Sequence, residues 1–533
     1  MISSGTSDAA ALSNAGAVRS HSLRVVWVVV FLVALLMRAG WGTYRLAQAD
    51  DPSALEFPDE QQYWDMAASL YAGEGLKDEL GFRATRMPLF PTLLAPFVAM
   101  PYGVVLAKSF HWFLGAGVAA LAALLATDLF DRRVGWIAGL LVAFDPFLVF
   151  FSSLLLTETL FTGVLVWLWW IAWPFMRHGS SHEASSGQEQ VANMAVRPWV
   201  FLAPAVALAF YVREAAVGLA ILLLWWIAWP IMRHGSSGDA SSSQESKAES
   251  LSRKPMGHRF STGETHGLQT RATLFGIGSN MAMRPWQFLA VAGALAIYVR
   301  EAAAGLVVVL LCLIVVCRRF DRRVVGVALI TGVFVYGAIL PWSIRNAMVT
   351  GEMCRLTTRA GISLYDGVGP QATGASNLGP INQMSEVRGL SETEWNRYFL
   401  RESFKAIKGD PMRIVRLAGV KLRRMWNPFP NVESYQSGAT RLISAAWTLP
   451  VFALAAIGAV ALLVRRREHG WKVAALLLLP ALYLSALHCV FVGSVRYRLG
   501  AMPMLEILAA YTLVEIVSWV RRRGRDTETA NAR

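Results

Sequence analysis

The sequence predicts an all-α, polytopic membrane protein, and three observations carry that prediction. The chain of 533 residues is 55% hydrophobic and only 16% charged, whereas soluble domains carry roughly 25% charged residues. Apolar runs long enough to cross a hydrocarbon core of about 30 Å recur along the whole chain. Basic clusters stand between these runs, as the positive-inside rule predicts for cytoplasmic loops.

The same clusters account for the net charge of +14. Because the arginines flank apolar segments, we expect contact with membrane lipids and no binding of nucleic acid. The cysteines are scattered and show neither metal-ligand spacing nor a disulfide framework; they are Cys312, Cys317, Cys354 and Cys489. No cofactor is expected, and a need for a divalent metal stays open because no cluster of ligands is evident.

The basic clusters also predict a topology. We expect membrane helices near 25–45, 104–129, 134–151, 154–176, 324–342, 443–464, 472–492 and 501–520. The polar N-terminus lacks a small-residue cleavage site after its apolar run, so it is expected to be a cytoplasmic tail before an uncleaved helix. Loops 46–103 and 343–441 then lie on the extracytoplasmic face of a cell (inner or plasma) membrane, with both termini in the cytoplasm.

The middle of the chain holds a tandem duplication. Residues 169–190 recur almost unchanged as 225–246, and 197–219 recur as 284–306. Each later segment has two apolar stretches around the break "YVREAA", which favours a helical hairpin with its Arg-Glu tip on the outer side. Two hairpins bring the expected total to about 12 transmembrane helices.

This topology divides the chain into segments of different character. The expected segments are a cytoplasmic tail (1–23), an N-terminal transmembrane core (24–176) with an outer loop at about 46–103, a duplicated hairpin region with Ser/Gly-rich cytoplasmic loops (177–317), a further membrane helix (318–342), an outer loop (343–441), C-terminal membrane helices (442–520) and a cytoplasmic tail (521–533). Within the second outer loop, residues 394–407 and 411–426 carry apolar residues at helical spacing among Arg and Lys. Such helices lie in the headgroup layer.

Charged residues at the outer boundary are the candidates for function, because burial of a charge there needs a partner or a role. Asp59 and Glu60 follow a proline and could equally cap a helix. Glu158 lies inside an apolar run and could bond within the helix lattice. Arg213 and Arg300 could extend to lipid headgroups, and the arginines of "GSVRYRLGAMP" (493–503) could be interfacial anchors.

The order of these motifs resembles that of the GT-C membrane glycosyltransferases. Acid pair, "RMPLFP", "TETLF", "YVREAA", "PWSIRN" and "RYRLGAMP" follow one another with the expected sidedness. The likeness is greatest to the glycosyltransferase 39 or protein O-mannosyltransferase-like group, which includes lipid A aminoarabinose transferases and rhizobial galacturonosyltransferases. It runs from about residue 25 to 515, and it implies a GT-C-like fold.

The resemblance also implies roles for particular residues. Asp59 matches the family's catalytic acid and Glu60 its neighbour. Arg86 matches a basic residue thought to contact the lipid phosphate, although this chain has "RMPL" where the family has "KPPL". The remaining phosphate-contact candidates are Arg345, Arg496 or Arg498, and one of Arg213 and Arg300, with Tyr63 and Glu158 as further site candidates. The final motif departs from the usual "RYRLP", since its proline is displaced by three residues.

The expected function is therefore transfer of a sugar from a polyprenyl-phosphate donor to a lipid, glycan or protein acceptor, with inversion at the anomeric carbon. A carboxylate can accept the proton of an attacking hydroxyl, and arginines stabilise a departing phosphate. A membrane transporter or lipid flippase is the alternative from another class, and it predicts pseudo-symmetric halves that the sequence does not show. A degenerate, non-catalytic family member is the third possibility.

Overall fold

The computed structural model describes residues 5–177, 285–464 and 469–531. Those residues form an all-helical fold of a polytopic membrane protein. The described part contains seven helices that are long and apolar enough to cross a membrane. These spans are Val26–Gln48 of α1 (Gly5–Gln48), α4 (Gly103–Leu129), α7 (Thr157–Arg177), α14 (Arg322–Thr350), α19 (Gly438–Val464), α20 (Gly470–Val490) and Val495–Glu528, which comprises η4 (Val495–Ala501) and most of α21 (Met502–Asn531).

The bundle packs around small and aliphatic side chains. Helix α4 lies against α1 and α7, and α19 lies against α21. Alanines of α4 at 0% exposure permit the close approach of its neighbours. Trp169 of α7 is fully buried and donates its indole N–H to the carbonyl of Leu476 in α20, 2.7 Å away. A buried tryptophan with its N–H bonded joins the two halves of the described chain.

Two of the predicted membrane helices have different bounds in the structure. The helix expected near 134–151 is divided at Asp145 into α5 (Arg132–Phe144) and α6 (Pro146–Phe151). Proline has no N–H to continue the helix, and Asp145 accepts from the amide of Leu148 as the cap of α6. The helix expected to end at residue 342 continues to Thr350, with Pro341 inside it.

The second copy of the repeat forms two short apolar helices, α12 (Pro285–Val299) and α13 (Ala303–Cys317). Three residues, 300–302, separate them, and α14 begins five residues after α13 ends. The first copy, 197–219, and the repeated segment 225–246 lie outside the described residues. The expected total of about twelve membrane helices therefore stays a prediction.

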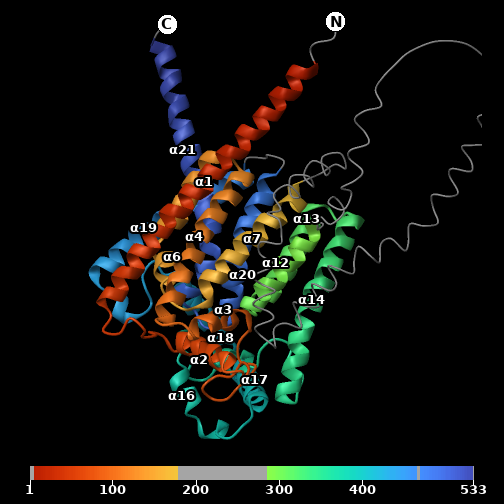
Figure 1. The fold of residues 1–533 in the computed structure, drawn as a ribbon, viewed down its shortest axis with the longest axis vertical. Coiled ribbons are helices and arrows are strands. Elements are labelled where there is room, and N and C mark those ends of the chain that lie inside the picture. The colour runs from red at the N-terminus through yellow and green to blue at the C-terminus, as the bar shows by residue number, and fades with distance from the viewer. Residues whose placement is uncertain (1–4, 178–284, 465–468, 532–533) are drawn as a thin grey trace, which may run out of the picture.

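The two ends of the bundle differ in structure. Both described termini protrude at one end, and the connecting segments with short helices gather at the other (Figure 1). This second end carries α2 (Pro58–Tyr71), α3 (Leu89–Val98), α15 (Ala360–Val368), α16 (Leu378–Asn382), η2 (Ser385–Val387), α17 (Glu392–Gly409), α18 (Pro411–Met425) and η3 (Glu433–Tyr435). The helices predicted at 394–407 and 411–426 are present as α17 and α18, while the outer position of segment 343–441 stays a prediction.

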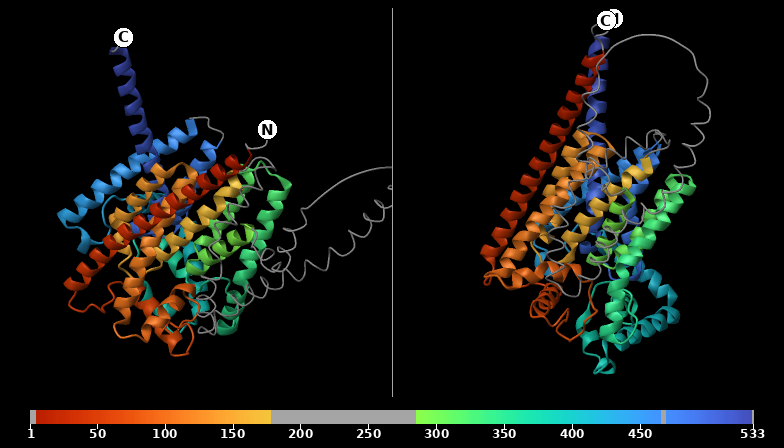
Figure 2. Two further views of the ribbon diagram at one scale, coloured as in Figure 1. Left: turned by 45° about the horizontal axis from the view of Figure 1, so that its top comes forward. Right: turned by 45° about the vertical axis from the view of Figure 1, so that its right-hand side comes forward.

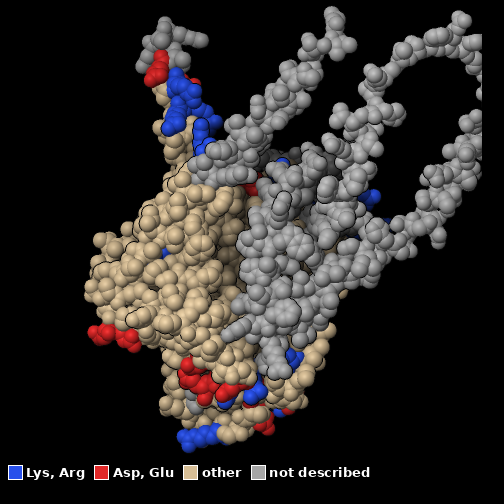
Figure 3. All heavy atoms as spheres, in the orientation of Figure 1, with Lys and Arg blue, Asp and Glu red and all other residues tan. Residues whose placement is uncertain are grey.

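Charge is distributed in the same way. The visible middle of the bundle is almost free of charged side chains, while acidic and basic groups gather at its two ends (Figure 3). Helices α1 and α19 lie at the outside of the bundle in the further views (Figure 2). An uncharged belt between charged ends is what a bilayer requires of a helical bundle.

Candidate active site

Helix α2 begins with the two acids, and they serve different purposes. Glu60 is fully buried. One of its carboxylate oxygens accepts from the amides of Glu56, at 3.0 Å, and Phe57, at 3.2 Å. The other oxygen accepts from the amide of Leu155, 2.7 Å away, in the turn before α7. Glu60 therefore closes the first turn of α2 and attaches it to the bundle, which is the capping role considered above.

Asp59 points instead toward arginines. One of its oxygens pairs with Arg86 and lies 3.9 Å from a guanidinium nitrogen of Arg359. The other oxygen lies 2.5 Å from the Nη1 of Arg496. Burial by itself would raise the pKa of Asp59, but the three guanidinium groups hold that pKa well below its ordinary range. The carboxylate is therefore ionised, and 26% of its side chain is still exposed.

Glu158 forms the second half of this arrangement. It lies in the first turn of α7, is 2% exposed, and pairs through one oxygen with both Arg496 and Arg300. The Nη1 of Arg300 is 3.1 Å from that oxygen. Arg496 thus connects Glu158 with Asp59. We call the six residues Asp59, Glu158, Arg86, Arg300, Arg359 and Arg496 the site cluster.

Aromatic rings support the guanidinium groups of the site cluster. Arg86 lies over the ring of Tyr63, 4.9 Å from its centroid. Arg300 lies 5.1 Å from the ring centroid of Tyr497, which stacks on His488 with centroids 4.1 Å apart. Cation–π contacts hold the arginines in place without neutralising them, so their charges stay available to an anion.

Two residues of the site escaped the sequence analysis. Gln62 accepts from the Nε of Arg86 at 2.8 Å and from Arg359 at 3.3 Å. Its position three residues after Asp59 places it on the same face of α2, and this spacing could have identified it. Arg359 carried no such signal. It reaches the site because the amide of Thr358 bonds to the carbonyl of Ala84, 2.8 Å away, which joins the two loops.

The remaining candidates lie elsewhere. Arg345 donates to the carbonyl of Arg83 at 2.6 Å and lies over the ring of Trp342. Arg498 is fully buried and donates to the carbonyls of Met425 and Asn427. Arg213 falls outside the described residues. Of the paired alternatives, the described structure thus brings Arg496 and Arg300 to the acids.

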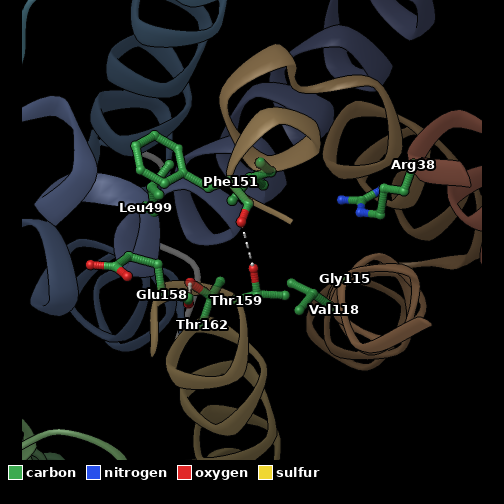
Figure 4. Close-up of a pocket in the computed structure, with 9 residues that line it drawn as sticks. Arg38, Gly115, Val118, Phe151, Glu158, Thr159, Thr162 and Leu499 are labelled. Carbon is green, nitrogen blue, oxygen red and sulfur yellow. Dashed lines mark hydrogen bonds between the residues drawn. The ribbon is translucent and has the colours of Figure 1, made fainter. Parts of the chain in front are cut away.

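A cavity lies beside Glu158, which is one of its lining residues. Arg38, Gly115, Thr159, Thr162 and Leu499 are among its lining residues (Figure 4). Thr162 donates to the main-chain carbonyl of Glu158 at 2.7 Å. The carboxylate of Glu158 points away from the other lining residues, and Arg38 lies on the opposite side of the cavity (Figure 4). The same carboxylate makes the ion pairs with Arg300 and Arg496.

The cluster favours an anionic ligand. Four guanidinium groups contact two carboxylates, and burial together with the neighbouring charge of Arg86 lowers the pKa of Arg359. A bound anion would relieve this crowding of like charges. Within the described residues, no group of three or more His, Cys, Asp or Glu side chains is placed to hold a metal ion.

Comparison with known proteins adds a remote structural likeness. No protein-family model matches the sequence, and no curated protein does. Among solved structures, the archaeal oligosaccharyltransferase AglB from Archaeoglobus fulgidus, in complex with an inhibitory peptide and a dolichol-phosphate, aligns with 96% of this chain and 52% of its own. The TM-score is 0.38 and the sequence identity 11%. The apo form of the Archaeoglobus fulgidus oligosaccharyltransferase aligns with 95% of this chain and 52% of its own, at a TM-score of 0.38 and 13% identity.

The chain spans about half the length of these structures. A structural likeness at this TM-score says nothing about activity. Any proposal about activity has to rest on the chemistry of the site cluster.

Proposed function

We propose that the protein is an integral membrane glycosyltransferase that moves a sugar from a polyprenyl-phosphate donor to a hydroxyl acceptor on the extracytoplasmic face. The observation that carries this proposal is the site cluster itself. Ionised Asp59 stands among three arginines at the charged end of an apolar bundle. A polyprenyl chain needs apolar surface, and its phosphate needs guanidinium groups beside it.

The reaction assigns a task to each part of the cluster. The acceptor oxygen forms a bond to the anomeric carbon of the sugar, and the bond from that carbon to the phosphate oxygen breaks. The electron pair leaves with the phosphate, whose new charge Arg86, Arg359 and Arg496 stabilise. Asp59 orients the acceptor hydroxyl and takes its proton, and attack opposite the leaving group inverts the anomeric carbon.

The low pKa of Asp59 belongs to the free enzyme. A carboxylate held by three guanidinium groups is a weak base. When a phosphate takes over Arg86 and Arg496, Asp59 loses part of their field, and its pKa rises toward the ordinary value. Donor binding thus prepares the base, which favours an order in which the donor binds before the acceptor.

Glu158 and Glu60 act through other residues. Glu158 is 2% exposed and pairs with Arg300 and Arg496, so it fixes the orientation of these two guanidinium groups toward the phosphate. Glu60 fixes the first turn of α2 and with it the position of Asp59. Both are positioning residues in this mechanism.

Binding of polyprenyl phosphate, the part of the donor that remains after sugar transfer, tests the proposal. Purified full-length protein in nanodiscs is titrated with an undecaprenyl monophosphate and, in parallel, with the uncharged polyprenol. We expect saturable binding of the phosphate, at least tenfold weaker binding of the alcohol, and loss of the phosphate preference in Arg496→Ala. Arg397→Ala is the matched control, because the side chain of Arg397 on α17 is 61% exposed and pairs with Glu352 outside the site cluster.

Equal affinity for the phosphate and the alcohol would contradict the proposal. A transporter or flippase would bind the phosphate too, so transfer itself has to be measured. Incubation with polyprenyl-phosphate hexoses and membrane extract is expected to release polyprenyl phosphate with time. Binding and translocation without any such release would favour the transporter.

A further inference from the structure

The duplicated region holds two versions of one sequence segment, and each version carries an arginine, Arg213 or Arg300, that could pair with Glu158. Residues 197–219 and 284–306 differ at five positions. In the structure, α7 contains the start of the first copy of the other repeated segment, 169–190, and it packs directly on α12 from the second version. The bundle therefore combines the beginning of the duplicated region with its end.

We propose that residues 284–306, and not 197–219, supply the hairpin arginine of the site cluster, Arg300, and that 197–283 is an insertion that the site does not need. Arg300 lies between α12 and α13 and pairs with nearly buried Glu158. The opposite assignment would place Arg213 there. Because the two versions share "YVREAA", the presence of the arginine does not distinguish them. The packing of the helices around it does.

Gly293 is the position that distinguishes the two versions. A Cβ added there would lie 3.2 Å from a methyl of Val335 and 3.3 Å from a methyl of Val307. Both valines are buried, at 5% and 4% exposure. The first version has Val206 at the equivalent position. A valine would add two methyl groups beyond this Cβ, where α12 meets α13 and α14, so the helices would have to move apart.

A second difference acts in the same direction. Val291 lies in the interior of α12, and the first version has Pro204 in its place. Proline removes a main-chain hydrogen bond and bends the helix. Such a bend would come nine residues before the arginine and would redirect it. The close packing around Gly293 and the unbroken helix at Val291 are thus both properties of the second version.

Other contacts of this hairpin involve residues that both versions share, so these contacts do not distinguish the two versions. Tyr298 donates to the carbonyl of Ala338 at 2.7 Å, and Tyr483 donates to the carbonyl of Ala302 at 2.8 Å. The first version keeps the equivalent tyrosine, Tyr211, and the equivalent alanine, Ala215. These contacts fix the tip next to Glu158, but the faces of α12 determine which sequence can form it.

Matched substitutions in the full-length chain test the proposal. Arg300→Gln and Gly293→Val should each lower the melting temperature in detergent by several degrees, because the first leaves Glu158 less compensated and the second overpacks α12. Arg213→Gln and Val206→Gly make the corresponding changes in the first version and should leave the melting temperature unchanged. Equal effects of Arg213→Gln and Arg300→Gln would overturn the proposal.

A double variant keeps the test informative if Arg300→Gln is poorly folded. Glu158→Gln combined with Arg300→Gln should be more stable than the sum of the single effects predicts, because the double change removes both charges of the pair. Glu158→Gln combined with Arg213→Gln should be additive. Coupling to Arg213 instead of Arg300 would also overturn the proposal.

Deletion of residues 197–283 is the most direct experiment. It joins Val196 to Arg284 and so restores the natural "VRPW" junction of the first version. The shortened protein should insert into the membrane, elute as one species and melt near the full-length temperature. Aggregation or a flipped C-terminus would show that the deleted segment is needed.

The inference depends on the proposed function only for the meaning of the site. Melting temperature and membrane insertion do not involve a substrate. If the wild type binds no polyprenyl phosphate while Arg300 and Arg213 still differ, the proposed function fails and the assignment of the copy stands. If the phosphate binds but the two arginines behave alike, the reverse holds.

Discussion

Arg496 and Arg498 stand two residues apart in η4, yet their surroundings differ completely. A 3₁₀ helix completes a turn in three residues, so side chains two apart point in different directions. Arg496 reaches Asp59 and Glu158. Arg498 is fully buried, donates to two main-chain carbonyls, and lies over the rings of Phe147 and Phe452.

Arg498 belongs to a second charged group inside the bundle, formed by Arg38, Asp145, Arg498 and Glu506, which we call the core cluster. All four residues are at most 1% exposed, and Asp145 is close enough to interact electrostatically with both arginines. Arg38 donates to the carbonyls of Ala34, Val142 and Ala143, each at 3.2 Å.

The arginines of the two clusters differ in their hydrogen-bond acceptors. In the core cluster the hydrogen bonds of Arg38 and Arg498 described above end on main-chain carbonyls, which no ligand can replace. In the site cluster the arginines meet carboxylates at the edge of the bundle, and a phosphate can compete with those. Variants of the two clusters should therefore fail in different assays.

Asp59→Asn should give the largest effect on activity. The amide keeps the shape of the side chain but cannot accept a proton from the acceptor. General-base contributions are about 10²- to 10⁴-fold in rate, and we expect the turnover of sugar transfer to fall by that amount. The variant should still fold, with a modest fall in melting temperature, because Asp59 is partly exposed. Unchanged turnover would exclude Asp59 as the base.

Arg498→Leu should give the largest effect on stability. Removing the guanidinium group leaves two carbonyls without their donor and reduces the compensation of Asp145. Breaking a buried charge interaction costs about 3–5 kcal/mol, measured as a loss of melting temperature and of folded yield. Arg496→Leu should lose less stability and more phosphate binding. If the two variants show the same ratio of losses, the distinction between the clusters is wrong.

The sequence predicted the long helices because apolar runs and basic clusters are local signals. It also placed Asp59, Glu158, Arg300 and Arg496 among the candidates, since a charge beside an apolar run is visible without a structure, and the family resemblance added Arg86. The sequence did not show which of these residues contact one another, and therefore did not show the site.

What the sequence could not separate were residues with the same local pattern. Glu60 beside Asp59 and Arg498 beside Arg496 look equivalent in the sequence. Their roles depend on which main-chain groups lie nearby after folding, such as the amide of Leu155 and the carbonyl of Asn427. Arg359 was missed for the same reason, because a contact between two loops brings it to Asp59.

Acid should weaken the site cluster through Asp59. The three arginines hold the pKa of Asp59 well below its unfolded value of about 3.9. A carboxylate with a lowered pKa stabilises the fold above the unfolded pKa, and that contribution disappears as the pH falls through the folded pKa. The difference in melting temperature between the wild type and Asp59→Asn should therefore be constant near neutral pH and shrink below about pH 4. A difference that grows in acid would contradict the ion pairing of Asp59.

Gln62 should give the smallest effect, and it tests whether neutral groups also shape the site cluster. Its amide oxygen accepts from both Arg86 and Arg359, so it holds the two guanidinium groups at the spacing found around Asp59. Gln62→Ala removes two hydrogen bonds to charged donors, which the remaining ion pairs partly compensate. We expect polyprenyl-phosphate binding to weaken about threefold to tenfold, with little change in melting temperature. Gln61→Ala is the matched control, because Gln61 is exposed and its side-chain amide donates to Asp65 on the same helix, 2.7 Å away. Equal effects of the two alanine variants would mean that the spacing of the arginines is set by their ion pairs with Asp59 and not by Gln62.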